Sequence, residues 1–134
     1  MLKNDAKRVP KSAVFTLDLS ADAGNNELGY IEGNIAITRV MLVVDEAFNG
    51  TTPTITVTQA GDTHFTNADI ASETVATSDL FTPVTGTIAP LFKATKTLWE
   101  AALVSGGSTT GSLKVVVEYI QLDTEPGLHS ATNN

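Results

Sequence analysis

Cysteine is absent from the 134 residues of this chain. Its absence excludes a disulfide framework, a thiolate nucleophile and a zinc site with cysteine ligands. Long apolar runs are also lacking, because no stretch approaches the ~18 consecutive apolar residues of a membrane-spanning helix. The start, Met1 to Asp5, is polar and lacks the apolar segment of a secretory signal peptide. We therefore expect a protein that is made in the cytoplasm, has no membrane partner and is not secreted by a signal peptide.

Positive charge is scarce. Eight lysines and arginines stand against 15 aspartates and glutamates, so the net charge is −7 and the pI about 4.6. A surface that binds nucleic acid needs a basic footprint for the phosphates. The composition therefore predicts no nucleic-acid partner.

The few cations are unevenly placed. Lys3, Lys7, Arg8 and Lys11 against Asp5 give +3 in the first 11 residues, which leaves −10 for the other 123. This split marks residues 1–11 as a separate basic arm. Two interpretations stay open: the arm docks on an acidic neighbour, or it is a solvated leader.

The rest of the chain is dominated by a period of two, which is typical of strands with one buried face. Ser12 to Ser20 places Ala13, Phe15, Leu17 and Leu19 on one side. Further strands are expected at Asn34 to Glu46, Thr54 to Thr58 and Leu113 to Leu122. The run Met41 to Val44 is apolar on both faces, which favours a central strand covered on both sides.

Turn-forming residues separate these strands. Ala21 to Gly29 is predicted as a loop, and Asn49-Gly50 as a turn in a connection that Thr51 to Pro53 lengthen. Gly61 to Ser78 is expected to be a long connection with a short helical turn capped by Asn67. Val84 to Ile88 and Pro90 to Lys93 are short strand-like pieces.

The run Lys96 to Val104 combines residues that favour a helix with alternation that favours a strand. The glycine-rich stretch Ser105 to Ser112 follows it and leads into the strand Leu113 to Leu122. This context favours a β-hairpin in which Trp99, Ala101 and Leu103 share one face, with Val115, Val117 and Tyr119 or their alternates opposite. Trp99, the single tryptophan, is a candidate anchor of either the core or an interface.

These elements predict an all-β protein, a single β-sandwich that is jelly-roll-like or immunoglobulin-like, with flexible terminal arms. The expected organisation is a basic N-terminal arm at 1–11, a sandwich domain at 12–123 and a flexible tail at 124–134.

Candidate sites for chemistry are few, and none has a catalytic pattern. Asp45 and Glu46 are adjacent on a strand, so their side chains point to opposite faces, whereas carboxylate catalysis needs convergence on one substrate. His64 and His129 are the only histidines; each is interpreted as an exposed histidine without metal or triad partners. The sequence therefore predicts no enzyme, and no catalytic, cofactor-binding or metal-binding residue.

Two weaker patterns are explained by turn chemistry. Asp22, Asn25, Asn26 and Glu27 offer clustered oxygen ligands, but their spacing matches no EF-hand, and calcium binding by this loop stays open. The glycine-rich stretch Gly106 to Gly111 lacks the lysine of a phosphate-binding loop.

Three stretches carry a resemblance: VVDEAFNGTTPTITV from Val43 to Val57, the GDT at Gly61 to Thr63, and GGSTTGSLKVVVEYIQ from Gly106 to Gln121. They resemble the small, cysteine-free, Thr- and Gly-rich β-sandwich proteins of tailed-bacteriophage virions. The resemblance implies a non-enzymatic decoration or cement protein on the capsid exterior. Its partners would be the major capsid protein and sister subunits, in a homo-oligomer with a trimer favoured. The basic arm, Lys3, Lys7, Arg8 and Lys11, is then the candidate capsid-binding tether.

Two other classes remain. One is a tail, baseplate or head-fibre component of the same kind of virion. The other is a carbohydrate- or surface-binding module, which usually displays exposed aromatic side chains. With five Phe, two Tyr and one Trp, most of them in apolar strand patterns, the composition makes this module less favoured.

Overall fold

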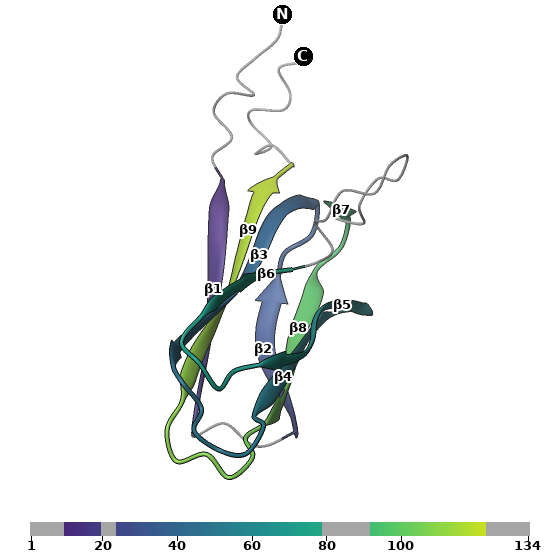
Figure 1. The fold of residues 1–134 in the computed structure, drawn as a ribbon. Coiled ribbons are helices and arrows are strands. Elements are labelled where there is room, and N and C mark those ends of the chain that lie inside the picture. The colour runs from purple at the N-terminus through teal and green to yellow at the C-terminus, as the bar shows by residue number, and fades with distance from the viewer. Residues whose placement is uncertain (1–9, 20–23, 79–91, 123–134) are drawn as a thin grey trace, which may run out of the picture.

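The computed structural model describes residues 10–19, 24–78 and 92–122, which form two antiparallel sheets packed face to face (Figure 1). Its strands are β1 (Lys11–Asp18), β2 (Gly24–Ile31), β3 (Ile35–Glu46), β4 (Thr54–Gln59), β5 (Asp62–Asp69), β6 (Val75–Thr77), β7 (Phe92–Lys93), β8 (Thr97–Val104) and β9 (Ser112–Gln121). The described residues contain no helix, and therefore no helix that is long and apolar enough to span a membrane. The predicted all-β sandwich is confirmed.

The strand order follows from a chain that passes repeatedly from one sheet to the other. The five-stranded sheet has the order β1-β9-β3-β6, with β7 also paired to β3, and the four-stranded sheet has the order β2-β8-β4-β5. In the immunoglobulin order the first two strands are neighbours in one sheet. Here β1 and β2 lie in different sheets, so the immunoglobulin-like alternative does not apply.

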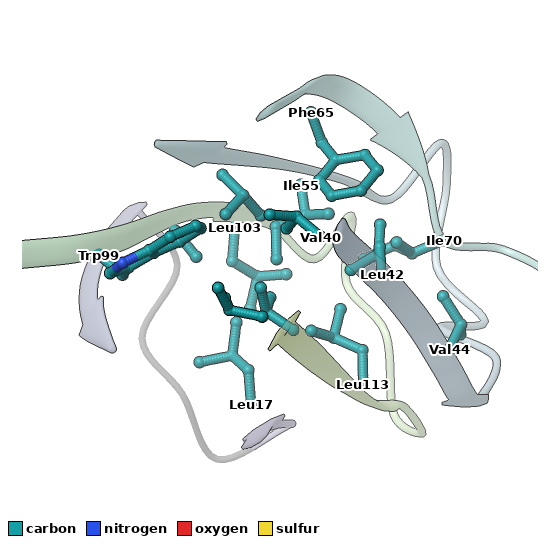
Figure 2. Packing of buried hydrophobic residues seen from close by; sticks show 14 of the residues in the cluster. Leu17, Val40, Leu42, Val44, Ile55, Phe65, Ile70, Trp99, Leu103 and Leu113 are labelled. Atoms are coloured by element: carbon teal, nitrogen blue, oxygen red, sulfur yellow. The ribbon is translucent and has the colours of Figure 1, made fainter. Parts of the chain in front are cut away.

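Alternation along each strand builds the core between the sheets. Figure 2 shows side chains from both sheets meeting there, among them Leu42, Leu103 and Trp99. In β3, Leu42 and Val44 are buried, whereas Met41 and Val43 are only partly buried. The prediction of a strand covered on both faces was therefore wrong: β3 is central in its sheet, but its second face is turned outward.

The strand predicted at Lys96 to Val104 is confirmed as β8, but the predicted hairpin with β9 was wrong. β8 pairs with β2 and β4, and β9 pairs with β1 and β3 in the other sheet. Trp99 and Val115 still face each other's sheet, because both point into the core. The period of two fixes which face is buried, but it does not fix the neighbouring strand.

Two segments predicted as connections contain strands. The predicted loop Ala21 to Gly29 includes the start of β2 at Gly24, and a bulge lies between Glu27 and Gly29. The predicted long connection Gly61 to Ser78 contains β5 and β6 and no helical turn. In both segments, polar side chains occupy the outward positions of the strands, so their composition is similar to that of a loop. The piece predicted at Val84 to Ile88 lies outside the described residues.

The tight hairpin turn is at Ala60-Gly61. β4 ends at Gln59 and β5 begins at Asp62, so the loop has two residues, with φ of 44° at Ala60 and 98° at Gly61. Two positive φ values are typical of the type I′ turn that suits the twist of paired strands. The Asn49-Gly50 pair instead lies in the connection between β3 and β4, which changes sheets.

Asn49 braces that connection against the one between β8 and β9. The backbone N–H of Thr109 donates to Asn49 Oδ1 at 2.7 Å, and Asn49 Nδ2 donates to Thr109 Oγ1 at 3.0 Å. The N–H of Thr51 donates to the carbonyl of Gly106 at 2.8 Å. The stretch from Val43 to Val57 is therefore two strands and a braced crossover, and its Asn-Gly pair has a structural role.

Candidate functional site

The basic arm is described only at its last cation. Lys11 begins β1, is exposed and lies opposite Tyr119 of β9. Lys3, Lys7 and Arg8 lie outside the described residues, as does the tail from residue 123. Because β1 begins where β9 ends, the chain enters and leaves the sandwich at the same end (Figure 1).

Trp99 is fully buried and stacks on His64, with ring centroids 4.8 Å apart. His64 itself is only 4% exposed, so its interpretation as an exposed histidine was wrong. It lies on β5 and points into the core rather than into a loop. His129 lies outside the described residues.

A chain of hydrogen bonds surrounds His64. Gln59 Nε2 donates to Thr97 Oγ1 at 3.1 Å, which turns Gln59 Oε1 toward His64 Nε2 at 3.0 Å. His64 Nε2 therefore carries the proton, and Nδ1 accepts from the hydroxyl of Ser78 at 3.0 Å. Because the N–H of Ser78 donates to the carbonyl of Val40, the network joins the two sheets.

Burial lowers the pKa of His64 to about 4; the nearby Asp62 carboxylate raises it by less, and Lys93 lowers it further. Lys93 also forms an ion pair with Asp62. The imidazole is thus neutral over the ordinary pH range and shielded from solvent. This arrangement suits a structural link between the sheets, and it offers no access for a substrate.

One residue of this network can be predicted from the sequence. Gln59 continues the inward positions of Ile55 and Val57 on β4, so alternation alone places its amide in the core. His64 had no such signal, because the register of β5 against β4 shifts twice and two adjacent residues, His64 and Phe65, are buried.

The remaining candidate carboxylates do not form a site. Asp45 and Glu46 are exposed, and Asp45 accepts from Lys114 Nζ at 2.5 Å. Asn25, Asn26 and Glu27 lie along β2, and Asp22 is outside the described residues. Within the described ranges, no three His, Cys, Asp or Glu residues gather in a group that could hold a metal ion.

One open cleft of about 450 Å³ lies between the two sheets at the end where β1 begins. Ala13, Tyr30, Ile31, Glu32, Lys96 and Tyr119 line it. The ammonium of Lys96 lies 4.8 Å from the ring centre of Tyr30, and burial, followed by the charge of Glu32, raises the pKa of Tyr119. The cleft contains one cation and one anion and no group arranged for catalysis.

The fold and these surfaces define a small β-sandwich whose described residues show no assembled catalytic or metal centre. No protein-family profile and no curated protein matches the chain. Solved structures do match in fold. A chain in the capsid of Ralstonia phage GP4 has a TM-score of 0.57 at 19% identity, and the match covers 87% of this chain and 86% of that one.

Two further capsid structures give the same result. A chain in the cyanophage Pam1 capsid asymmetric unit has a TM-score of 0.56 at 21% identity, covering 83% of this chain and 84% of that one. A chain in the acidic stable capsid structure of Helicobacter pylori bacteriophage KHP30 has a TM-score of 0.53 at 16% identity, covering 86% and 90%. In fold, the chain thus resembles phage virion structural proteins.

Proposed function

We propose that this chain is a non-enzymatic structural protein of a tailed-phage virion that binds the outer surface of the capsid and stabilises it. The observation that carries the proposal is the coverage of the three capsid matches, which extend over most of both chains in each case. The similarity is therefore to whole small subunits of capsids and not to one domain of a much larger chain.

The strand order adds support. Six of the eight steps between successive strands change sheets, and only the steps from β4 to β5 and from β6 to β7 stay within one sheet. The one tight hairpin within the described residues joins β4 to β5. This wrapping is what a jelly roll requires, and jelly rolls are frequent in viral capsid proteins. We interpret the fold as jelly-roll-like.

The proposed mechanism is binding without chemistry. The basic arm, with Lys3, Lys7, Arg8 and Lys11, ties the subunit to the major capsid protein, while sister subunits associate as a trimer at local threefold positions. A ligand that binds only the assembled shell stabilises it by mass action. Lys11 supports this role, because it is exposed and lies at the start of β1, where the arm joins the sandwich.

The test uses heads of the same virus that lack this protein. Purified full-length chain should cosediment with the heads and raise their melting temperature, and a chain without residues 1–11 should be retained less. A matched control replaces Lys96, a cation of the sandwich itself, with glutamine and should be retained normally. Failure of the full-length chain to bind heads would contradict the proposal, and native mass from light scattering would test the trimer.

A further inference from the structure

The outer face of the five-stranded sheet carries a continuous row of apolar side chains. Val14 of β1, Val116 of β9 and Met41 of β3 lie directly opposite one another across the three strands. Val14 is 53% exposed, and the other two are partly buried. In the next row, Val43 and Val75 are paired, and Lys114 of β9 lies opposite Val43. Single exposed valines are ordinary on a protein surface, but a row across three strands is a candidate contact surface.

Charged residues flank this apolar row on both sides and cancel one another. On one side Lys114 pairs with Asp45, and on the other Arg39 pairs with Glu118. Arg39 Nε and Nη2 each lie 3.0 Å from a carboxylate oxygen of Glu118. The rows beside the apolar row are therefore close to neutral, although the whole chain has a net charge of −7.

The outer face of the four-stranded sheet is different. Glu27 of β2 lies opposite Glu100 of β8, so two carboxylates face each other in its central rows. On β4, Thr58 lies opposite Glu100 and continues its row, and Thr56 lies opposite Ala102 in the neighbouring row. On the five-stranded sheet the exposed carboxylates Asp18 and Glu46, both opposite Ser112, lie two rows away from the apolar row. Two copies that each carry a net charge of −7 therefore repel one another less at the apolar row and its neutral neighbours than across the paired carboxylates of the four-stranded sheet.

We propose that the outer face of the five-stranded sheet packs against the same face of a second copy of this chain. Along β9 the outward residues are Lys114, Val116 and Glu118. The order is basic, apolar, acidic. A second copy rotated by 180° about an axis along the apolar row has its β9 running in the opposite direction, so its Glu118 lies over Lys114 of the first copy. The apolar rows then meet each other. A contact of this type uses the same patch on both subunits, so it joins two copies and leaves no free patch to which a third copy could bind.

The contact goes beyond the proposed function, because it joins two copies of the purified protein and needs no shell. Only its use on a particle rests on the proposed function. In a shell of icosahedral symmetry, local twofold axes lie between neighbouring threefold positions. The contact would there connect one trimer to the next.

The absence of cysteine allows a direct test with single-cysteine variants of the full-length chain. Val14 on the proposed contact and Val104 on the outer face of the four-stranded sheet are both 53% exposed, so Val14→Cys and Val104→Cys are matched in accessibility. With a short bismaleimide linker and dilute protein, Val14→Cys should form covalent dimers and Val104→Cys several-fold fewer. Equal yields from the two variants would overturn the proposal.

A charge variant tests the geometry of the contact. Lys114→Glu in the Val14→Cys background places a carboxylate over Glu118 of the second copy, and the dimer yield should fall several-fold while circular dichroism stays that of the sandwich. An unchanged yield would overturn the twofold arrangement. If Val14→Cys forms no dimers but Val14→Lys abolishes binding to heads, the face belongs to the capsid: the proposed function then stands and the second-copy contact is overturned.

Discussion

The imidazole of His64 lies flat against the indole of Trp99, with ring planes 16° apart and centroids separated by 4.8 Å. One ring comes from β5 and the other from β8, two strands that are not neighbours in the four-stranded sheet. Both rings are buried, and His64 forms hydrogen bonds to Gln59 and Ser78 through its two ring nitrogens. A titratable group is thereby placed where protonation opposes folding.

The stability of the protein should fall as the pH drops below the ordinary range. In the unfolded chain His64 binds a proton with its usual pKa of 6.5, whereas in the folded chain its pKa is about 4. The unfolded state therefore binds more protons, and the contribution of His64 to the free energy of unfolding decreases from about pH 6.5 and levels off below about pH 4. The size of the loss from this one group is roughly 3 kcal/mol. Urea unfolding between pH 4 and 8 measures it.

Two variants assign that pH dependence to the buried histidine. His64→Phe keeps an aromatic ring against Trp99 but has no titrating group, so its unfolding free energy should vary much less between pH 4 and 6.5. His129→Gln removes the other histidine and should leave the slope in place. An unchanged slope in His64→Phe would assign the acid sensitivity to carboxylates instead.

The Gln59 side chain should contribute to stability through the network and not through volume. Gln59→Leu fills similar space but removes the acceptor of His64 Nε2 and the donor to Thr97. Loss of a buried hydrogen-bond partner costs about 1–3 kcal/mol. Thr58→Val, one residue earlier on the outward face of β4, should change stability by less than about 0.5 kcal/mol. Equal effects of the two substitutions in urea unfolding would contradict a role for the network.

The alternation of apolar residues was sufficient to predict β1, β3, β4 and β9 and the two-sheet class, whereas β8 was predicted from its context. It could not predict which strands pair, because β8 and β9 present the same alternating pattern whether they form a hairpin or face each other across the core. Asn49-Gly50 is among the strongest short sequence signals for a turn, yet its geometry is set by contacts with Thr109, 60 residues away. The network at His64 depends on such long-range placement, and it was missed for the same reason.

The two-residue turn at Ala60-Gly61 offers a stabilising substitution. Ala60 has a φ of 44°, in the left-handed region that costs an alanine about 1 kcal/mol and that asparagine tolerates better. Ala60→Asn should therefore raise the free energy of unfolding by about 0.5–1 kcal/mol. Ala60→Val, with a branched Cβ at the same φ, should lower it. A loss of stability in Ala60→Asn would show that the turn type is not the one described.

Gly111 should be among the least replaceable residues of the crossover between β8 and β9. A Cβ at this position would lie 2.4 Å from the ring of Phe48, which is fully buried and cannot move aside, and the φ of 150° adds backbone strain. Gly107 in the same crossover has a φ of 78°, but a Cβ there meets nothing within 4 Å. Gly107→Ala therefore carries the backbone cost alone, about 1 kcal/mol, whereas Gly111→Ala adds overpacking of about 1–3 kcal/mol. In thermal unfolding Gly111→Ala should melt well below Gly107→Ala, and the reverse order would mean that Phe48 does not close this end of the core.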